Sequence, residues 1–408
     1  MRRVTRTALL AGALAAIVSV PLVAGTVTAA SASDVAKAAP AASAKVRDVC
    51  AKRPGRARCY AQVRTDIRPL TGVRAKAEPP PGYGPADLQA AYALPRTGGA
   101  ASTIAIVDAG DGANAEADLA VYRQTYGLPP CTTANGCFRK VNQHGQAAPL
   151  PQDQGWGVEI ALDLDMVSAA CPACKILLVE ADEAFSKDLA ESENTAATLG
   201  AAAISNSWGG LEGPDDLNWA SAFAHPGVAI TVSTGDAGYT TGDFPSSLPS
   251  VIAVGGTALT KDPGNARGWS EKAWNGGGSS CSAWFAKPAW QHDKNCPGRT
   301  SSDISAVADP ATGLAVYNTD STPDDGHWLV VGGTSASSPF IAGIVGLSGH
   351  PERFGDASRF YRHHDKLNDV VTGSNVAFMD CGGDDLCTAG PGYDAPTGWG
   401  TPNGIGNF

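Results

Sequence analysis

The sequence predicts one large α/β domain built on a doubly wound, mostly parallel sheet with helices on both faces. The first observation is a set of short, continuous apolar runs, which are typical of strands buried on both sides of a sheet. They lie at residues 103–108, 175–179, 202–205, 228–233 and 251–254. The second observation is that helical stretches separate these runs, at residues 119–126, 157–170, 188–199 and 215–224. This alternation favours a parallel sheet, whose ligands bind at the carboxyl ends of the strands.

The first 32 residues have the pattern of a secretory signal peptide. Arg2, Arg3 and Arg6 precede an apolar run at residues 8–24, and Ala30-Ser31-Ala32 offers a small-residue cleavage site. Nothing later in the chain is apolar for long enough to cross a bilayer. We therefore expect a secreted, extracellular protein whose mature form has no membrane span.

Residues 33–79 form a short basic segment in front of an acidic domain at residues 80–408. The segment holds 11 Lys or Arg against 4 Asp or Glu, whereas the whole chain has a net charge of -10. One interpretation is a solvated, disordered arm. The other is a cationic pro-segment that binds the acidic domain at neutral pH and loosens when carboxylates are protonated. We expect no nucleic-acid partner in either case.

The folded domain is expected to begin after the proline run at residues 79–81, with a short helix that carries Leu88, Ala91, Tyr92 and Leu94 on its apolar side. The ten cysteines indicate disulfides, because the predicted compartment is oxidising. They fall in neighbouring pairs: 50 with 59, 131 with 137, 171 with 174, 281 with 296, and 381 with 387. We expect bridges in that order, although Cys171 and Cys174 could instead form a redox motif or half of a zinc site.

The stretch VVGGTSASSPFIAGIVGL at residues 330–347 has the features of a nucleophile turn. Apolar residues end a strand, Gly332 and Gly333 allow a sharp turn, and an apolar helix follows. A serine at such a turn lies where N–H groups and the helix dipole favour developing negative charge. Thr334 or Ser335 could also merely cap the helix.

Two acidic residues on the helix at 157–170 are candidates for a base. Glu159 and Asp163 are four residues apart and share one helix face, whereas Asp165 points elsewhere. The two alternatives are an exposed acidic face and a coupled carboxylate pair that shares one proton. None of the seven histidines begins an apolar helix, so a carboxylate base is the simpler interpretation.

These motifs resemble the sedolisins, a family of serine-carboxyl peptidases on the subtilisin-like scaffold, from about residue 82 to the C-terminus. The Gly-Thr-Ser-Ala-Ser-Ser-Pro string matches the nucleophile segment and makes Ser335 the attacking residue. In the resemblance Glu159 is the base and Asp163 orients it. In the stretch ITVSTGDAGY, Asp236 takes the place of the oxyanion donor.

The resemblance also implies a substrate cleft. SNSWGG is similar to the substrate-lining strand, which implies contacts from Ser205, Ser207, Trp208 and Gly209. AVGGT at residues 253–257 is similar to the segment that closes the sheet, and residues 276–313 contain further family-like stretches.

A structural calcium site is expected near the C-terminus. Two carboxylates and backbone carbonyls in a glycine-rich loop suit a hard cation. In sedolisins an Asp-Xaa segment and a later Gly-x-Gly-x-Asp loop bind one calcium, and the matching residues here are Asp369, Val370, Gly390, Gly392 and Asp394.

The resemblance implies a secreted endopeptidase that hydrolyses protein or peptide substrates at acidic pH, with its own pro-segment as a further partner. A Ser-His-Asp peptidase of the subtilisin type and a catalytically silent binding protein are the alternatives. Two features depart from the family: residues 33–79 are too few for the usual folded propeptide, and Asp108 ends a strand where sedolisins usually have no acid. Asp108 could be a fossil position, a charge coupled to Glu159 or, as we expect, a solvated loop acid.

Overall fold

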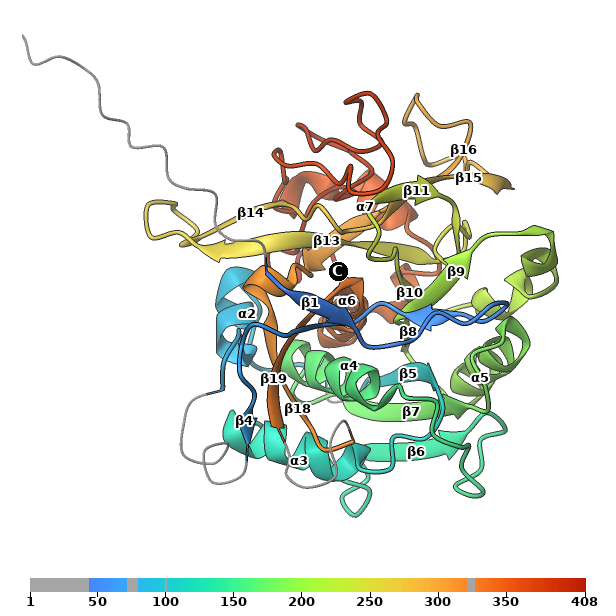
Figure 1. Ribbon diagram of the computed structural model, residues 1–408, viewed down its shortest axis with the longest axis vertical. Coiled ribbons are helices and arrows are strands. Elements are labelled where there is room, and N and C mark those ends of the chain that lie inside the picture. The colour runs from blue at the N-terminus through green and yellow to red at the C-terminus, as the bar shows by residue number, and fades with distance from the viewer. Residues whose placement is uncertain (1–43, 72–79, 100, 321–326) are drawn as a thin grey trace, which may run out of the picture. The chain divides into compact units, whose positions relative to one another are not determined.

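The computed structural model describes residues 44–71, 80–99, 101–320 and 327–408 (Figure 1). The predicted signal peptide and its cleavage site lie outside the described residues. The described residues form one compact unit, so the described part of the basic segment belongs to the same unit as the acidic domain. No helix among the described residues is long and apolar enough to cross a membrane.

The main sheet confirms the predicted parallel α/β architecture. Its strand order is β14-β13-β10-β8-β5-β7-β6, with β17 also paired to β13. Apart from the antiparallel β14, the neighbouring strands run parallel. The strands are β5 (Thr103–Ala109), β6 (Phe138–Asn142), β7 (Lys175–Ala181), β8 (Ala203–Asn206), β10 (Ala229–Ser233), β13 (Ile252–Lys261), β14 (Trp269–Ala273) and β17 (Ile304–Val307).

Helices cover both faces of this sheet, as β8 demonstrates. The Ser205 hydroxyl lies 3.0 Å from that of Ser338 on α6 (Thr334–Ser348), whereas the next residue, Asn206, interacts with Glu193 on α5 (Ser186–Thr198). Successive strand residues point to opposite faces, so α5 and α6 lie on opposite sides. Helix α4 (Gly157–Ala170) packs on α6, and α3 (Ala115–Thr125) packs on α4.

A second, antiparallel sheet joins the N-terminal segment to the strand before α6. Its order is β1-β3-β19-β18, and β4 also pairs with β19. Its strands are β1 (Val46–Asp48), β3 (Gln62–Arg64), β4 (Leu70–Thr71), β18 (Leu314–Asn318) and β19 (His327–Gly332). The blue strands of this segment pass in front of α6 in Figure 1. Residues 44–71 are therefore part of the sheet structure and not a solvated arm.

Two small sheets complete the strand set. One contains β12 (Asp243–Phe244), β9 (Trp208–Leu211) and β2 (Arg58–Cys59), and the other contains β11 (Tyr239–Thr241), β15 (Ser279–Ala286) and β16 (Gly298–Ser301).

Most predicted helices are present, with one correction. The short first helix is α2 (Pro85–Ala91), and α4 has the predicted bounds. The expected helix at 215–224 is wrong: two 3₁₀ turns occupy it, η1 (Pro214–Asn218) and η2 (Ala220–Phe223). The Asp216 carboxylate accepts the Gly213 N–H, and Pro226 limits the stretch from the other end. Short elements follow at η3 (Pro310–Thr312), η4 (Pro351–Arg353), α7 (Ser358–Arg362) and η5 (His364–Lys366).

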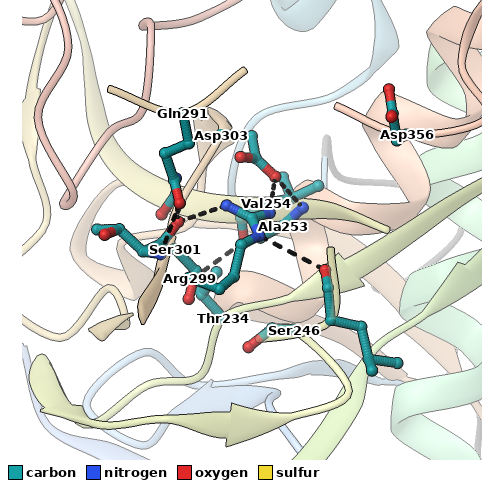
Figure 2. Close-up of polar contacts among 12 residues, drawn as sticks. Thr234, Ser246, Ala253, Val254, Gln291, Arg299, Ser301, Asp303 and Asp356 are labelled. Atoms are coloured by element: carbon teal, nitrogen blue, oxygen red, sulfur yellow. Dashed lines mark hydrogen bonds and ion pairs between the residues drawn. The ribbon is translucent and has the colours of Figure 1, made fainter. Parts of the chain in front are cut away.

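A buried ion pair ties β16 to the neighbouring loops. The Arg299 guanidinium contacts the Asp303 carboxylate at 2.5 Å, and neither side chain is exposed (Figure 2). The same Asp303 oxygen accepts the Ala253 N–H at 2.8 Å, and the other accepts the Tyr361 hydroxyl at 2.9 Å. A fully buried charge is tolerated only with such partners, so this pair fixes β13 against the C-terminal loops.

The five disulfides confirm the expected pairing. Cys50 bonds Cys59, and the other four bridges likewise join neighbours in the sequence: 131 with 137, 171 with 174, 281 with 296, and 381 with 387. Because Cys171 and Cys174 are bonded to each other, their thiolates do not form half of a zinc site in this structure.

Candidate active site

The turn between β19 and α6 presents Ser335 at the start of a helix. Gly333 adopts φ 109°, a conformation that favours glycine, and Ser335 is the second residue of α6. A side chain at Gly333 would overlap the Tyr60 carbonyl oxygen and crowd Asp236. The glycine therefore keeps open the space in front of the helix N-terminus, where the dipole favours negative charge.

The two predicted acids of α4 face this serine from inside the protein. Glu159 and Asp163 are both fully buried, so the exposed acidic face that their spacing also allowed is excluded. Asp163 accepts a hydrogen bond from the Ser207 hydroxyl at 2.9 Å. The structure brings the predicted pair to one place because α4 packs directly on α6.

Burial raises the pKa of Glu159 well above its usual range, and the charge of Asp108 adds to the increase, whereas the Ser335 hydroxyl and the Ala61 amide lower the pKa. Burial likewise raises the pKa of Asp163, again with Asp108 as the next cause. These carboxyl groups repel one another as anions in a dry site, so they share protons and titrate together.

Asp108 corrects one expectation. It is completely buried at the end of β5, and burial raises its pKa to about 7. Neither of its carboxylate oxygens has a hydrogen-bond partner among the described residues. Asp108 is therefore not a solvated loop acid but a third member of the carboxyl cluster with Glu159 and Asp163. The strand continues one residue beyond the predicted end, which carries the acid inside.

Asp236 lies in the loop after β10, beside the same helix N-terminus. One of its oxygens accepts the Thr334 N–H at 2.8 Å and the Thr334 hydroxyl at 2.9 Å. The other oxygen is buried and has no partner among the described residues. Burial raises the pKa of Asp236 to about 7. In its neutral form this carboxyl group can donate one hydrogen bond into the space that Gly333 leaves open.

The residues predicted to line the substrate cleft lie in two different places. Ser207, Trp208 and Gly209 contact residues 58–60, whereas Ser205 does not. The Ser207 carbonyl accepts hydrogen bonds from Ser335 Oγ and from Tyr60 N, at 3.0 and 3.1 Å. Trp208 and Gly209 pair through their backbones with Cys59 and Arg58 in β2. Ser205 lies apart from this strand, because its hydroxyl points under α6 toward Ser338.

The N-terminal segment supplies a residue of the site that sequence reasoning missed. Tyr60 N also lies 3.0 Å from Ser335 Oγ, and Ser335 N donates to the Tyr60 carbonyl oxygen at 3.4 Å. The Tyr60 hydroxyl reaches both oxygens of Asp243, at 2.7 Å each. No motif marks Tyr60 or Asp243. The one feature of the sequence that could have drawn attention to Tyr60 is that it follows a cysteine in a short basic segment.

The predicted calcium ligands come together in one loop region. The Asp369 carboxylate accepts the Gly392 N–H at 2.8 Å, and the Asp394 carboxylate accepts the Gly390 N–H at 2.9 Å. Val370 is buried beside Asp369. The second oxygen of Asp394 accepts the N–H and hydroxyl of Thr397. The two acids and the glycine loop are thus neighbours, as a shared cation would require.

Three of the histidines make contacts away from Ser335. His144 contacts Glu191 at 2.7 Å, His350 contacts Glu352 at 3.3 Å, and His364 stacks on Trp399. The groups that surround Ser335 are carboxyl, hydroxyl and backbone groups. Fold and site together define a subtilisin-like domain of the serine-carboxyl class.

Comparison with known proteins agrees with this class. The model of the Subtilase family matches residues 145–359, which is more than half of the chain. The chain belongs to the subtilase family and, within it, to the sedolisins.

Two curated relatives align over most of the chain. Kumamolisin from Bacillus sp. (strain MN-32) is 30% identical over 82% of this chain and 64% of its own length. Sedolisin from Pseudomonas sp. (strain 101) is 29% identical over 78% of this chain and 60% of its own. Human tripeptidyl-peptidase 1 is 34% identical over a shorter region, 39% of this chain and 31% of its own. The chain thus spans less than two thirds of the length of these relatives.

A solved structure supports the fold. Pseudomonas sedolisin, described as a serine-carboxyl proteinase complexed with two molecules of pseudo-iodotyrostatin, superimposes with a TM-score of 0.65 and 26% identity. The match covers 80% of this chain and 96% of that structure. The subtilisin-like fold class expected from the sequence is confirmed.

Proposed function

We propose that this chain is a secreted serine-carboxyl endopeptidase that hydrolyses peptide bonds at acidic pH. The observation that carries the proposal is the position of Ser335, at a helix N-terminus and surrounded by the buried acids Glu159, Asp163 and Asp236. A hydroxyl needs a base to become a nucleophile, and among the described neighbours of Ser335 the carboxyl groups are the ones that can serve as a base.

Each residue has a distinct task in the proposed reaction. Ser335 Oγ attacks the substrate carbonyl, and Glu159 takes its proton and passes it to the leaving amine. Asp163, held by the Ser207 hydroxyl, positions Glu159. The Ser335 N–H and a protonated Asp236 donate to the oxyanion, and loss of one such donor costs roughly 3 to 4 kcal/mol of transition-state stabilisation.

The proposed pH dependence of activity arises because one carboxyl group has to be protonated while another has to be ionised. Asp236 has to be neutral to donate, so activity is lost as the pH rises through its pKa of about 7. The carboxyl cluster has to keep one anion to act as the base, so activity is also lost when all its members are protonated. Because burial raises the pKa values of Glu159, Asp163 and Asp108, the cluster holds its protons more strongly than free carboxyl groups would.

Secretion and a pro-segment form part of the proposal. Five disulfides suit an oxidising compartment, and the first 32 residues have a signal-peptide pattern. Tyr60, within the predicted pro-segment at residues 33–79, contacts Ser335 through its backbone, which is the position expected of a pro-segment that keeps a peptidase inactive.

One structural calcium ion is also proposed. The donor set fits a hard cation, because the Asp369 and Asp394 carboxylates flank one glycine-rich loop. Asp369, Val370, Gly390, Gly392 and Asp394 would hold the ion, and its charge would offset the two neighbouring acids. The ion would stabilise the loop and would take no part in the reaction.

The experiment is cleavage of a mixed peptide library by the secreted protein from pH 3 to pH 8. Ser335→Ala and Glu159→Gln are the test variants, and Glu191→Gln, a half-exposed acid on α5, is the matched control. We expect cleavage that peaks in acid and falls at least about 100-fold in both test variants. Cleavage near neutral pH that survives Glu159→Gln would favour the histidine-based alternative. No cleavage at any pH by a chain freed of residues before 61 would favour the silent binding protein.

A further inference from the structure

A cavity of 620 Å³ lies between the loop that joins β15 to β16, helix α7 and the C-terminal loops at residues 385–399. These elements are found in the upper part of Figure 1. None of the residues that line this cavity is among those that surround Ser335, and none of them belongs to a strand. The cavity is therefore separate from the proposed catalytic site, and its size is that of a small-molecule site.

Four aromatic side chains line the cavity and contact one another: Trp290, Tyr361, Tyr393 and Trp399. The ring centroids of Trp290 and Tyr361 are 4.6 Å apart, and those of Tyr361 and Tyr393 are 5.4 Å apart. Tyr393 and Trp399 follow at 5.7 Å. All four residues are partly exposed. They offer a continuous aromatic surface, which is a feature of ligand sites.

Buried polar groups hold the two tyrosine rings of this surface in place. The Tyr361 hydroxyl donates to Asp303 at 2.9 Å, and the Tyr393 hydroxyl donates to the Ser302 carbonyl at 3.0 Å. Gln291 Nε2 donates to both hydroxyls, at 2.9 and 3.3 Å. The rings are thus fixed before a ligand arrives, which reduces the entropy lost on binding.

Two residues of the lining carry a buried polar atom without a hydrogen-bond partner among the described residues. One atom is Trp399 Nε1, which can only donate, and the other is Asp293 Oδ1, which accepts as part of a carboxylate. The Asp293 side chain is 1% exposed, and its other oxygen is bound to Lys287 Nζ at 2.7 Å and Thr300 Oγ1 at 2.9 Å. Buried polar atoms are normally paired. The lining therefore offers one donor and one acceptor to a ligand.

The charges around the cavity favour a neutral ligand. Two acidic and two basic residues of the lining balance when His292 is neutral: Asp293, Asp385, Lys294 and Arg362. The Arg299 guanidinium already lies over the Trp290 ring, 5.1 Å from its centroid. A cationic ligand would compete with Arg299 for this aromatic ring and would be repelled by its charge.

We propose that this cavity binds a neutral sugar unit of an oligosaccharide. A pyranose ring has faces of C–H groups that pack on aromatic rings, and hydroxyls at its edge that both donate and accept hydrogen bonds. One hydroxyl accepts the Trp399 N–H, and another donates to Asp293 Oδ1. Binding does not use Ser335, so it does not depend on the proposed peptidase activity.

Peptide ligands fit the lining less well. Addition of a peptide strand requires an open strand edge, and no lining residue belongs to a strand. A proline-rich segment binds aromatic grooves and could accept the Trp399 N–H, but proline has no N–H to donate to Asp293. A sugar matches the aromatic surface, the donor and the acceptor together.

The test is titration of the purified full-length Ser335→Ala chain with maltotriose, cellotriose and chitotriose, followed by calorimetry and by tryptophan fluorescence. Ser335→Ala prevents self-digestion and leaves the cavity unchanged. Decaproline and choline are the competing probes, for a proline-rich segment and for a cation. We expect saturable binding of at least one trisaccharide, with one ligand per chain, and no binding of decaproline or choline.

Two substitutions in the Ser335→Ala chain place the sugar in the cavity. Trp399→Phe keeps an aromatic ring and removes the donor, so the Kd should rise by roughly 3- to 10-fold. Trp290→Ala removes part of the aromatic surface and should raise the Kd by at least roughly 10-fold. Trp284→Phe and Trp284→Ala are the matched controls, because Trp284 on β15 is 47% exposed and does not line the cavity. Both controls should bind as the Ser335→Ala chain does, and urea unfolding verifies that each variant is folded.

The outcomes that overturn the sugar site are distinct. No saturable binding of any trisaccharide would mean that water alone satisfies the two unpartnered atoms. Binding of decaproline or choline without binding of a trisaccharide would assign the cavity to another class of ligand. Sugar binding that is unchanged in folded Trp290→Ala and Trp399→Phe would place the sugar elsewhere on the molecule. Binding weakened by Trp290→Ala alone would overturn the role of the Trp399 N–H.

Discussion

Glu193 on α5 makes a sharp prediction about stability and pH. Its side chain is completely buried, and neither carboxylate oxygen has a hydrogen-bond partner among the described residues. Burial raises its pKa from 4.5 to about 8, and the nearby Asn206 side chain acts in the opposite direction. The folded protein therefore keeps this proton at a pH where the unfolded chain has lost it, and folding stability falls as the pH rises from about 4.5 to about 8.

The size of the effect follows from the two pKa values. At about 1.4 kcal/mol per pKa unit, Glu193 lowers the free energy of unfolding by about 2 to 3 kcal/mol between pH 5 and pH 7. Glu193→Gln is neutral at every pH and nearly the same shape. Between pH 5 and pH 7, we expect the decrease in the free energy of unfolding to be about 2 to 3 kcal/mol smaller in Glu193→Gln than in the parent.

Urea unfolding at pH 5 and pH 7 measures the difference, with Ser335→Ala as the parent to prevent self-digestion. Other buried acids contribute equally to parent and variant, so they cancel when the two pH slopes are compared. Glu116→Gln is the matched control, because Glu116 lies on another helix, α3, and its carboxylate contacts the non-titrating Thr133, so its slope should equal that of the parent. The reasoning would be refuted by identical slopes for Glu193→Gln and its parent.

Three further predictions concern other parts of the molecule. Asp303→Ala leaves the buried Arg299 unpaired and should lower the unfolding free energy by about 3 to 5 kcal/mol in urea, whereas the exposed Glu352→Ala should cost less than about 1 kcal/mol. Asp236→Asn replaces a titrating donor by a permanent one, so the fall of kcat/KM between pH 6 and pH 8 should become smaller; an unchanged fall would assign the upper limit to another group. Removal of calcium by a chelator should lower the thermal midpoint, and Asp369→Asn should abolish that shift.

The sheet could be predicted from the sequence because its strands are continuous apolar runs bounded by polar or glycine-rich turns. β5, β7, β8, β10 and β13 all lie within a few residues of the expected ranges, apart from the longer end of β13. The stretch at 215–224 failed because alanine and leucine suggest a helix, while its aspartates and the following proline favour turns.

Glu159, Asp163 and Ser335 could be predicted as site residues, because each belongs to a pattern within one helix or one turn. Asp108 could not be placed in the same way, because its burial depends on strand β5 running between neighbours that are distant in sequence. Tyr60 could not be predicted as a site residue for a similar reason. Its partners Ser207, Asp243 and Ser335 are 147 or more positions away in the sequence, and no local pattern encodes such contacts.

Strand β19 pairs with the N-terminal segment at both of its ends, and this affects where the protein can be shortened. β3 and β4 cover one side of β19, and β18 covers the other. A chain that began at residue 80 would lose both covering strands and leave a row of unpaired N–H and C=O groups beside the apolar stretch Trp328–Val331. Such an open edge recruits strands from other molecules. A start at residue 61 retains the cover, so recombinant production of a soluble domain should begin there and not at the proline run.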